Sequence, residues 1–107
     1  MTKKTSVYVK KFSQISGLQK SETVEYFLLT TREKDFDVYG IEVLSGDVKK
    51  DAIEKQDLKR ISYSKDYVLD ILKYLYENSI KPEATLGIVL DILNINKIEK
   101  SNSLVLE

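Results

Sequence analysis

Two pairs of carboxylates have the residue types and the spacing that acid–base catalysis could use. Asp66 and Asp70 are separated by one turn of a predicted helix, and Asp35 and Asp37 flank a polar turn. Paired carboxylates act as general acid and base where their environments separate their pKa values. Charged residues make up 32% of this chain, and at that density such pairs are common. We therefore interpret them as a solvated helix face and a hairpin loop, and we expect no catalytic residue.

The residue types that the chain lacks exclude most other chemistry. It contains no His and no Cys, which excludes a histidine base, a thiol nucleophile and the usual ligand sets for zinc, copper and haem. Its 4 glycines are isolated from one another, so no phosphate-binding loop can be written. Residues 47–51 (DVKKD) lack the regular oxygen ligands and the closing glutamate of a calcium loop. We expect no metal and no cofactor.

A lysine cluster near the N-terminus is the basic feature that suggests a partner. Its members are Lys3, Lys4, Lys10 and Lys11. Interleaved with Tyr8, these lysines fit a platform for single-stranded nucleic acid. Lysines on a terminal strand also protect a sheet edge from aggregation, and we favour that interpretation. Because 17 basic residues balance 17 acidic ones, no net charge draws the chain to nucleic acid or to an anionic membrane.

Polar and aromatic side chains outside the expected core are the candidate binding residues. The chain has 7 tyrosines, and tyrosine is enriched at binding surfaces because a stiff ring with one polar tip loses little entropy there. For any single tyrosine the alternative is a ring at the edge of the core with its hydroxyl in water. The candidates are Tyr39, Glu42, Tyr74 and Asp91.

The first half of the chain has the residue patterns of β-strands. Residues 5–12 (TSVYVKKF) are β-branched and aromatic, with Val7 and Val9 on one face. Residues 22–31 (ETVEYFLLTT) are apolar on both faces, which predicts a central strand. The polar run 32–35 predicts a hairpin turn, and residues 13–20 suit a loop.

A third strand over residues 36–44 alternates well but slips in phase at Gly40. If Phe36 and Val38 face the core, Ile41 faces away unless one residue is inserted. Because glycine tolerates positive φ, this slip predicts a β-bulge at Tyr39-Gly40.

The next segment is ambiguous. Residues 45–47 (SGD) predict a turn. Residues 58–63 fit a fourth strand, whereas residues 52–56 fit either an edge strand or a short turn.

From Ser64 onward the apolar period becomes helical. Ser64 suits an N-cap, and Asp66 lies in the first turn, where the helix dipole favours an anion. The apolar stripe comprises Val68, Ile71, Leu72, Leu75 and Tyr76. We expect the helix to end at Asn78 or Ser79, because Pro82 excludes its continuation.

A second helix is predicted to start between Pro82 and Thr85 and to fade over residues 94–96. Its expected apolar face comprises Leu86, Val89, Leu90 and Leu93. Residues 97–107 are expected to form a polar tail, with residues 106–107 derived from a cloning vector.

Together these patterns predict a single α+β domain over residues 1–107, with an N-terminal strand and loop in residues 1–20. The expected architecture is an antiparallel sheet of three or four strands packed against a C-terminal helical hairpin. The pattern does not indicate which face of the sheet the helices cover. No secretory signal follows Met1, and no apolar stretch approaches the roughly 20 residues of a membrane span, so we expect a cytoplasmic protein.

A set of short segments resembles a small domain family of unknown function found in anaerobic, spore-forming bacteria. The segments are Val24-Glu25-Tyr26-Phe27-Leu28-Leu29, Tyr39-Gly40-Ile41-Glu42-Val43, Ile61-Ser62, Asn78-x-Ile80-x-Pro82 and Leu86-x-x-Val89-x-Asp91. The resemblance covers about residues 23–93. It implies a small stand-alone cytoplasmic protein and supplies no activity, ligand or catalytic residue.

Three functions follow as hypotheses. The favoured one is a non-catalytic module for protein–protein interaction or regulation, acting by strand addition at a sheet edge or by a helix–groove contact, with a homodimer through a sheet edge as a special case. The second is a nucleic-acid-associated regulator, linked to phage or sporulation, that uses the N-terminal lysine cluster. The third is an enzyme that uses carboxylates or lysine, which requires a concave pocket with converging polar groups.

Overall fold

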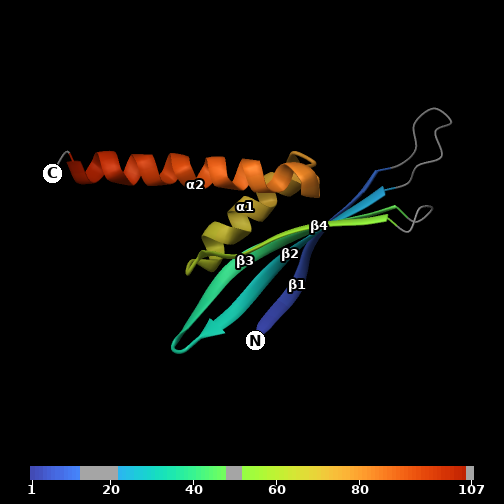
Figure 1. Cartoon of the computed structure of the whole chain (residues 1–107), viewed down its shortest axis with the longest axis horizontal. Coiled ribbons are helices and arrows are strands. Elements are labelled where there is room, and N and C mark those ends of the chain that lie inside the picture. The colour runs from blue at the N-terminus through green and yellow to red at the C-terminus, as the bar shows by residue number, and fades with distance from the viewer. Residues whose placement is uncertain (13–21, 48–51, 106–107) are drawn as a thin grey trace.

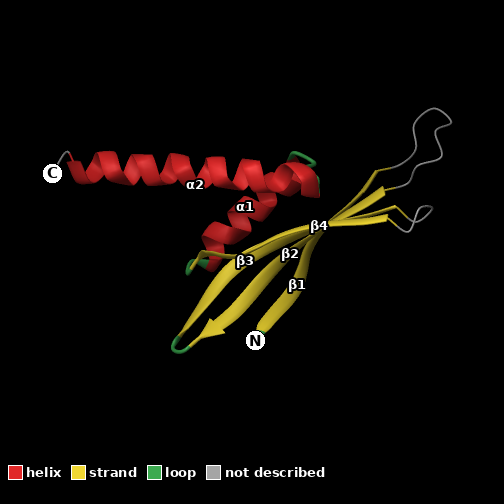
Figure 2. Ribbon diagram, viewed as in Figure 1, coloured by secondary structure: helices red, strands yellow, loops and turns green. Residues whose placement is uncertain are grey.

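The computed structural model describes residues 1–12, 22–47 and 52–105 as a four-stranded antiparallel sheet followed by two helices (Figures 1 and 2). The elements are β1 (Thr2–Phe12), β2 (Glu22–Glu33), β3 (Phe36–Asp47), β4 (Ala52–Ser62), α1 (Lys65–Glu77) and α2 (Pro82–Val105). This confirms the predicted α+β class and the larger of the two expected strand numbers. The loop predicted over residues 13–20, the calcium-loop candidate at 48–51 and residues 106–107 lie outside the described residues.

The strands follow one another in the sheet in the order β1-β2-β3-β4, so β2 and β3 are interior and β1 and β4 are edges. The two-sided apolar pattern of β2 therefore identified a central strand correctly. β2 and β3 are joined by a tight turn at Lys34 and Asp35, where Lys34 has φ 45°. The predicted hairpin turn within residues 32–35 is confirmed.

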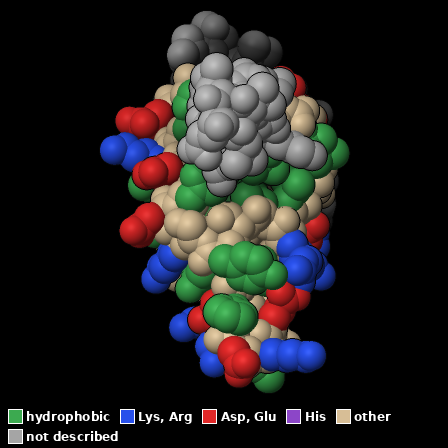
Figure 3. Space-filling model, turned by 90° about the vertical axis from the view of Figure 1, so that its left-hand side faces the viewer, with side chains coloured by type: hydrophobic (Ala, Val, Ile, Leu, Met, Phe, Trp, Pro, Cys, Tyr) green, Lys and Arg blue, Asp and Glu red, His purple; other side chains and the backbone are tan. Residues whose placement is uncertain are grey.

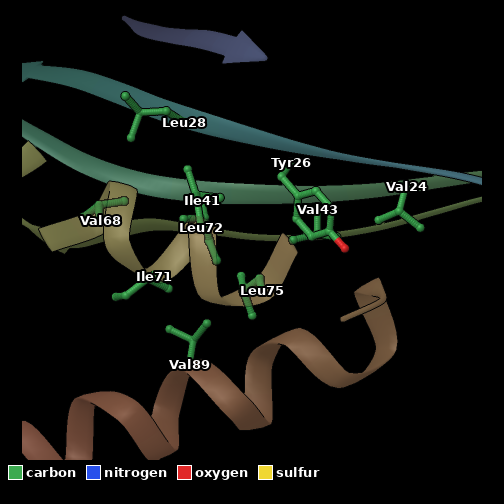
Figure 4. Packing of buried hydrophobic residues seen from close by; sticks show 10 residues of the cluster. All are labelled: Val24, Tyr26, Leu28, Ile41, Val43, Val68, Ile71, Leu72, Leu75 and Val89. Atoms are coloured by element: carbon green, nitrogen blue, oxygen red, sulfur yellow. The ribbon is translucent and has the colours of Figure 1, made fainter. Parts of the chain in front are cut away.

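Both helices lie on one face of the sheet, and α1 lies between the sheet and α2 (Figures 1 and 4). We call this the helix-covered face and the opposite one the open face. The core joins apolar side chains of β2, β3 and α1 with one from α2: Val24, Tyr26, Leu28, Ile41, Val43, Val68, Ile71, Leu72, Leu75 and Val89. In Figure 4, Val89 points from α2 toward Ile71 and Leu75 of α1. Helix α1 thus contacts all four strands, whereas α2 packs on α1 and also contacts β4 and β3.

Helix α1 has the boundaries and the buried face that its sequence predicts. The Ser64 side chain accepts a hydrogen bond from the Tyr67 backbone N–H at 3.3 Å, which satisfies one free donor of the first turn. The helix ends at the C-cap Asn78, and Ser79 follows with φ 53°. Four members of the predicted stripe are buried, and the fifth, Tyr76, is half-buried.

Helix α2 differs from the prediction in its length and in its buried face. It begins at Pro82 as expected but continues to Val105, so the predicted end over residues 94–96 is wrong. Residues 94–105 contain no Gly or Pro to stop a helix. Its fully buried side chains include Thr85 and Val89, whereas Leu86 and Leu90 are exposed. The predicted apolar face is therefore wrong at two of its four positions.

Strand β3 carries two corrections. Residues 45–47 do not turn: they extend β3, where Ser45 pairs with Val24 of β2 and Glu54 of β4. The predicted irregularity at Tyr39-Gly40 does occur, in the pairing of β3 with β4, but the extra residues lie on β4 between Leu58 and Ser62, and the pairing of β3 with β2 is continuous. Phe36 and Val38 therefore occupy the open face rather than the core face.

Gly40 is required for a different reason from the predicted one. The space that a Cβ at position 40 would occupy is already filled by backbone, since this Cβ would overlap the carbonyl oxygens of Leu58 and Lys59. The phase slip in the sequence thus marks the close approach of β4 to β3 rather than a turn with positive φ.

A bulge does occur in β1. The pairing with β2 shifts between Ser6 and Tyr8, which leaves Val7 as one extra residue. The bulge separates Val7, which packs against the core, from Val9, which is exposed. The prediction that both valines share one face is therefore wrong.

We predict that Gly40→Ala lowers the free energy of unfolding by about 3 kcal/mol, because backbone of β4 must move to admit a methyl group. The matched control is Gly87→Ala on the exposed surface of α2, where an added Cβ meets nothing within 4 Å. We expect the control to gain about 0.5–1 kcal/mol. Urea unfolding of both variants measures the contrast, and equal midpoints would contradict the close approach.

The Tyr26 phenol supports a second prediction. Tyr26 is fully buried, and its hydroxyl donates a hydrogen bond to the Ile80 carbonyl at 2.8 Å. Burial, and next the charge of Tyr76, raise the pKa of Tyr26 from 10.0 to about 12. Because this pKa lies above that of an unfolded tyrosine, the stabilisation is present below pH 10 and is lost as the pH rises through 12.

In an absorbance titration, we expect one tyrosine to ionise near pH 12 and this step to vanish in Tyr26→Phe. The variant also loses about 1 kcal/mol of stability, since the Ile80 carbonyl loses its donor. A final tyrosine step that is unchanged in the variant would show that another phenol is responsible.

Candidate binding groove beside the β1 edge

A groove of about 520 Å³ lies on the helix-covered face, between the N-terminal half of β1 and the first turns of α1. Its volume falls within the roughly 300–1,000 Å³ typical of ligand sites. One wall is a row across three strands, because Lys3 pairs with Thr30 and Thr30 pairs with Tyr39. Lys65, the first residue of α1, lines the side opposite this row. The strand register and the start of α1 therefore bring ammonium, hydroxyl and phenol groups into one groove.

The groove has an excess of positive charge. Its lining supplies two ammonium groups, from Lys3 and Lys65, and one carboxylate, from Asp37. The carboxylate is already engaged, since Asp37 Oδ1 accepts from Arg32 Nη1 at 3.4 Å. Within the described part of the chain, neither lysine has an ion-pair partner of its own. An anionic group is thus the complementary ligand for this groove.

The remaining lining of the groove is apolar. Val7 of β1, Leu28 of β2 and Leu69 of α1 contribute aliphatic surface beside the charged groups. A few convergent polar groups on an apolar lining fix the orientation of a bound group.

Strand β1 borders the groove and is an edge of the sheet, and among the described strands it pairs with β2 alone. Alternation along this strand divides the lysine cluster between the two faces. Lys3 and Lys10 lie on the helix-covered face, whereas Lys4 and Lys11 lie on the open face. The cluster therefore does not form one basic patch.

On the open face, Lys4 ties β1 to the middle of the sheet. Lys4 Nζ lies 2.9 Å from Glu42 Oε2 of β3 and 4.5 Å from the ring centroid of Phe27, which belongs to β2 between them. The Glu42 side chain is only 7% exposed, and that of Lys4 is 45% exposed. A carboxylate this buried depends on its cation, so Glu42 anchors the edge strand.

On the helix-covered face, β1 is tied to the end of α1. Lys10 Nζ donates to the Tyr76 carbonyl at 2.5 Å and to Ser79 Oγ at 2.9 Å, and it lies 4.6 Å from the Tyr76 ring centroid. The ring of Tyr8 stacks on that of Tyr76, with centroids 4.6 Å apart. These contacts hold the C-terminal half of β1, whereas its N-terminal half borders the groove.

A further contact holds the same end of the sheet to the start of α2. Lys81 Nζ donates to Glu22 Oε2 at 2.8 Å and lies 5.2 Å from the ring centroid of Phe12. The hydrogen bond that Lys81 donates to Glu22 raises the pKa of Lys81, so its ammonium stays charged.

The four candidate residues from the sequence are dispersed. Tyr39 lines the groove. Glu42 lies on the opposite face of the sheet in its contact with Lys4, and Tyr74 and Asp91 are exposed on α1 and α2. The fold does not bring these four together.

Sequence reasoning missed Lys65 as a groove residue and treated Asp37 only as a turn carboxylate. The alternation of β3 could have placed Asp37 on the same face as Tyr39, because the two are two residues apart. Nothing in the sequence places the start of α1 over that row of strand residues, because this depends on tertiary packing.

Three global features complete the description. No group of three or more His, Cys, Asp or Glu among the described residues is arranged to hold a metal ion. None of the helices described here is long and apolar enough to cross a membrane. On the face shown in Figure 3, basic and acidic side chains are interspersed around hydrophobic ones.

The sequence profile of a family of unknown function, DUF6514, matches residues 5–94. The match begins at residue 5 rather than near 23, so most of β1 lies within the family domain. No curated protein and no solved structure matches the chain.

The pairing of Lys4 with Glu42 gives an asymmetric prediction. We expect Lys4→Met to cost about 2 kcal/mol of stability, because it leaves the Glu42 carboxylate buried without its cation. Glu42→Gln costs less, about 1 kcal/mol, because the half-exposed Lys4 returns to water. Lys11→Met, on the same strand and face, is the control and stays within about 0.5 kcal/mol of the parent. Thermal unfolding at neutral pH measures all three, and a Lys4 variant no worse than the control would contradict the anchoring role.

Proposed function

The chain belongs to DUF6514, a family of unknown function, and we propose that it is a non-catalytic protein-interaction module that binds an extended acidic segment of a partner along β1. Strand addition needs a free sheet edge, and β1 offers 11 residues of one. The observation that carries the proposal is the combination of this edge with an electropositive groove directly beside it. Backbone hydrogen bonds supply affinity in this binding mode, and side-chain pockets supply specificity.

The arrangement of the lysines supports an acidic partner over a second copy of the chain. When two β1 strands pair antiparallel about a two-fold axis, residues of the same face oppose one another, so one register puts Lys3 opposite Lys10 and another puts Lys4 opposite Lys11. Like charges directly opposite one another destabilise a strand pair. An acidic segment paired with the same edge would instead be attracted by these lysines. The homodimer through β1 is therefore not the function that we propose.

The second edge of the sheet is a poorer template. Strand β4 carries a multi-residue irregularity between Leu58 and Ser62, and α2 also contacts β4. This irregularity is longer than the one-residue bulge of β1 at Val7, so the row of outward amides and carbonyls is more disrupted on β4, which favours β1 as the receiving strand.

The side chains of the groove support binding rather than catalysis. Among the described residues, its lining includes a single carboxylate, Asp37, which is paired with Arg32, and the whole sequence lacks His and Cys. A carboxylate pair of the kind that acid–base hydrolysis uses would need a second acid in the groove.

A protein partner also has more support than nucleic acid. Lys4 is paired with Glu42, Lys10 donates to Tyr76 and Ser79, and the cluster is split between two faces. Nucleic-acid binding depends on a continuous set of phosphate contacts. For the cellular setting we propose the cytoplasm of a bacterium, with support from the absence of Cys and from the sequence resemblance to a family of spore-forming anaerobes.

Hydrogen exchange tests strand addition directly. A display library of random peptides, each about twelve residues long to span β1, is selected on the full chain, and the enriched peptide is added to labelled protein. We expect the amides within residues 2–12 that are directed away from β2, which alternate on either side of the bulge at Val7, to exchange at least about tenfold more slowly in the complex. The control is the same peptide with its acidic residues replaced by lysine, which is expected to leave exchange unchanged.

N-methylation of the peptide gives an independent test of the same binding mode. Methyl groups on alternate peptide amides should abolish binding in one register and spare it in the other, because only one set faces β1. Protection confined to β4 or the helices, equal effects in both registers, or a library without enriched peptides would each refute strand addition at β1.

A further inference from the structure

We infer that the groove beside β1 is a specificity subsite for a carboxylate side chain of the added strand, with an aliphatic side chain two residues away on the same face. This assignment rests on the proposed function. It adds the chemical class of the residue that the groove selects and the lysines that select it.

The strand geometry directs a side chain of the partner into the groove. In a strand paired with β1, alternate side chains lie on the helix-covered face, about 4.5–5.5 Å from their neighbours in β1. The β1 residues on that face in its N-terminal half are Lys3 and Thr5, and both line the groove. A partner side chain opposite either of them therefore enters it.

The charged groups of the groove favour a carboxylate. Lys3 approaches from the strand and Lys65 from the first position of α1, where the helix dipole adds to the attraction of an anion. The phenol of Tyr39 and the hydroxyl of Thr30, in the same row as Lys3, can donate hydrogen bonds to it. Because Asp37 is engaged by Arg32, it leaves both ammonium groups available.

The apolar lining accounts for the second selected position. A volume of about 520 Å³ exceeds what one carboxylate fills. Val7 follows Lys3 in β1 and Leu28 precedes Thr30 in the antiparallel β2, so both lie on the same side of the Lys3–Thr30 pair, and Leu69 lies one helical turn after Lys65. The next partner side chain on the same face, two residues away, meets this aliphatic surface.

A phosphorylated side chain is the other anion that two lysines could hold. Phosphate recognition commonly uses the bidentate guanidinium of arginine, and the groove lining contributes only lysines as its cations. We therefore assign the subsite to a carboxylate and include phosphoserine as one arm of the test.

The test measures fluorescence-anisotropy titrations of the library-selected peptide against variants of the full chain. We expect Lys3→Gln and Lys65→Gln each to weaken binding about tenfold. The matched controls are Lys11→Gln, on the other face of β1, and Lys73→Gln, exposed on α1 outside the groove, and each is expected to change affinity less than about twofold. Glutamine at the first position of α1 is not expected to unfold the helix.

Peptide substitutions complete a double-mutant cycle. Replacing the groove-facing acid of the peptide by Gln should cost the same factor of about ten, and the Lys3→Gln variant should then weaken the Gln peptide no further. A phosphoserine peptide that binds as tightly as the glutamate peptide, or additive losses in the cycle, would overturn the assignment.

The two proposals fail in distinguishable ways. If β1 amides become protected but Lys3→Gln behaves like Lys11→Gln, strand addition stands and the carboxylate subsite is refuted. If the amides of β1 show no protection, the proposed function fails first, and the subsite fails with it.

Discussion

The packing of the α1 stripe against β2 and β3 is the interaction on which the rest of the molecule depends. Val68, Leu72 and Leu75 are fully buried against a sheet whose strands are 11–12 residues long. A helix of 13 residues spans about 20 Å, whereas a strand of 12 residues spans about 40 Å. One short helix can therefore cover only part of the face, and α2, which packs on α1, contacts the sheet mainly at β4 and β3 rather than at β1. The groove lies beside the first turns of α1, where the helix-covered face near β1 is no longer covered.

The edge strand is held firmly on both faces, which suits it to act as a template. Lys4 reaches Glu42 across the open face, and Lys10 and Tyr8 contact Tyr76 on the helix-covered face. A strand ordered in advance loses little conformational entropy when a partner pairs with it. The same lysines act against pairing with a second copy, so one set of charges both protects the edge and selects what it accepts.

Local patterns predicted the elements well, and tertiary packing determined what they missed. The two-sided apolar pattern of β2, the Ser64 cap and the α1 stripe each depend on neighbours in the sequence. Gly40 was singled out correctly, but its reason lies in the approach of the distant β4 backbone. The exposed Leu86 and Leu90 follow from the way α2 rests on α1. For the groove, Tyr39 was among the candidates, whereas Lys65 joins it only through the docking of α1.

The most direct measurement of the central claim is a set of NOE contacts between β1 and a bound, library-selected peptide. The account predicts Hα–Hα or Hα–HN contacts that run in register along residues 2–12 and no such series to β4, with a peptide side chain near the methyl groups of Val7 and Leu28. A peptide that forms its series of contacts with β4, α1 or α2 would contradict it.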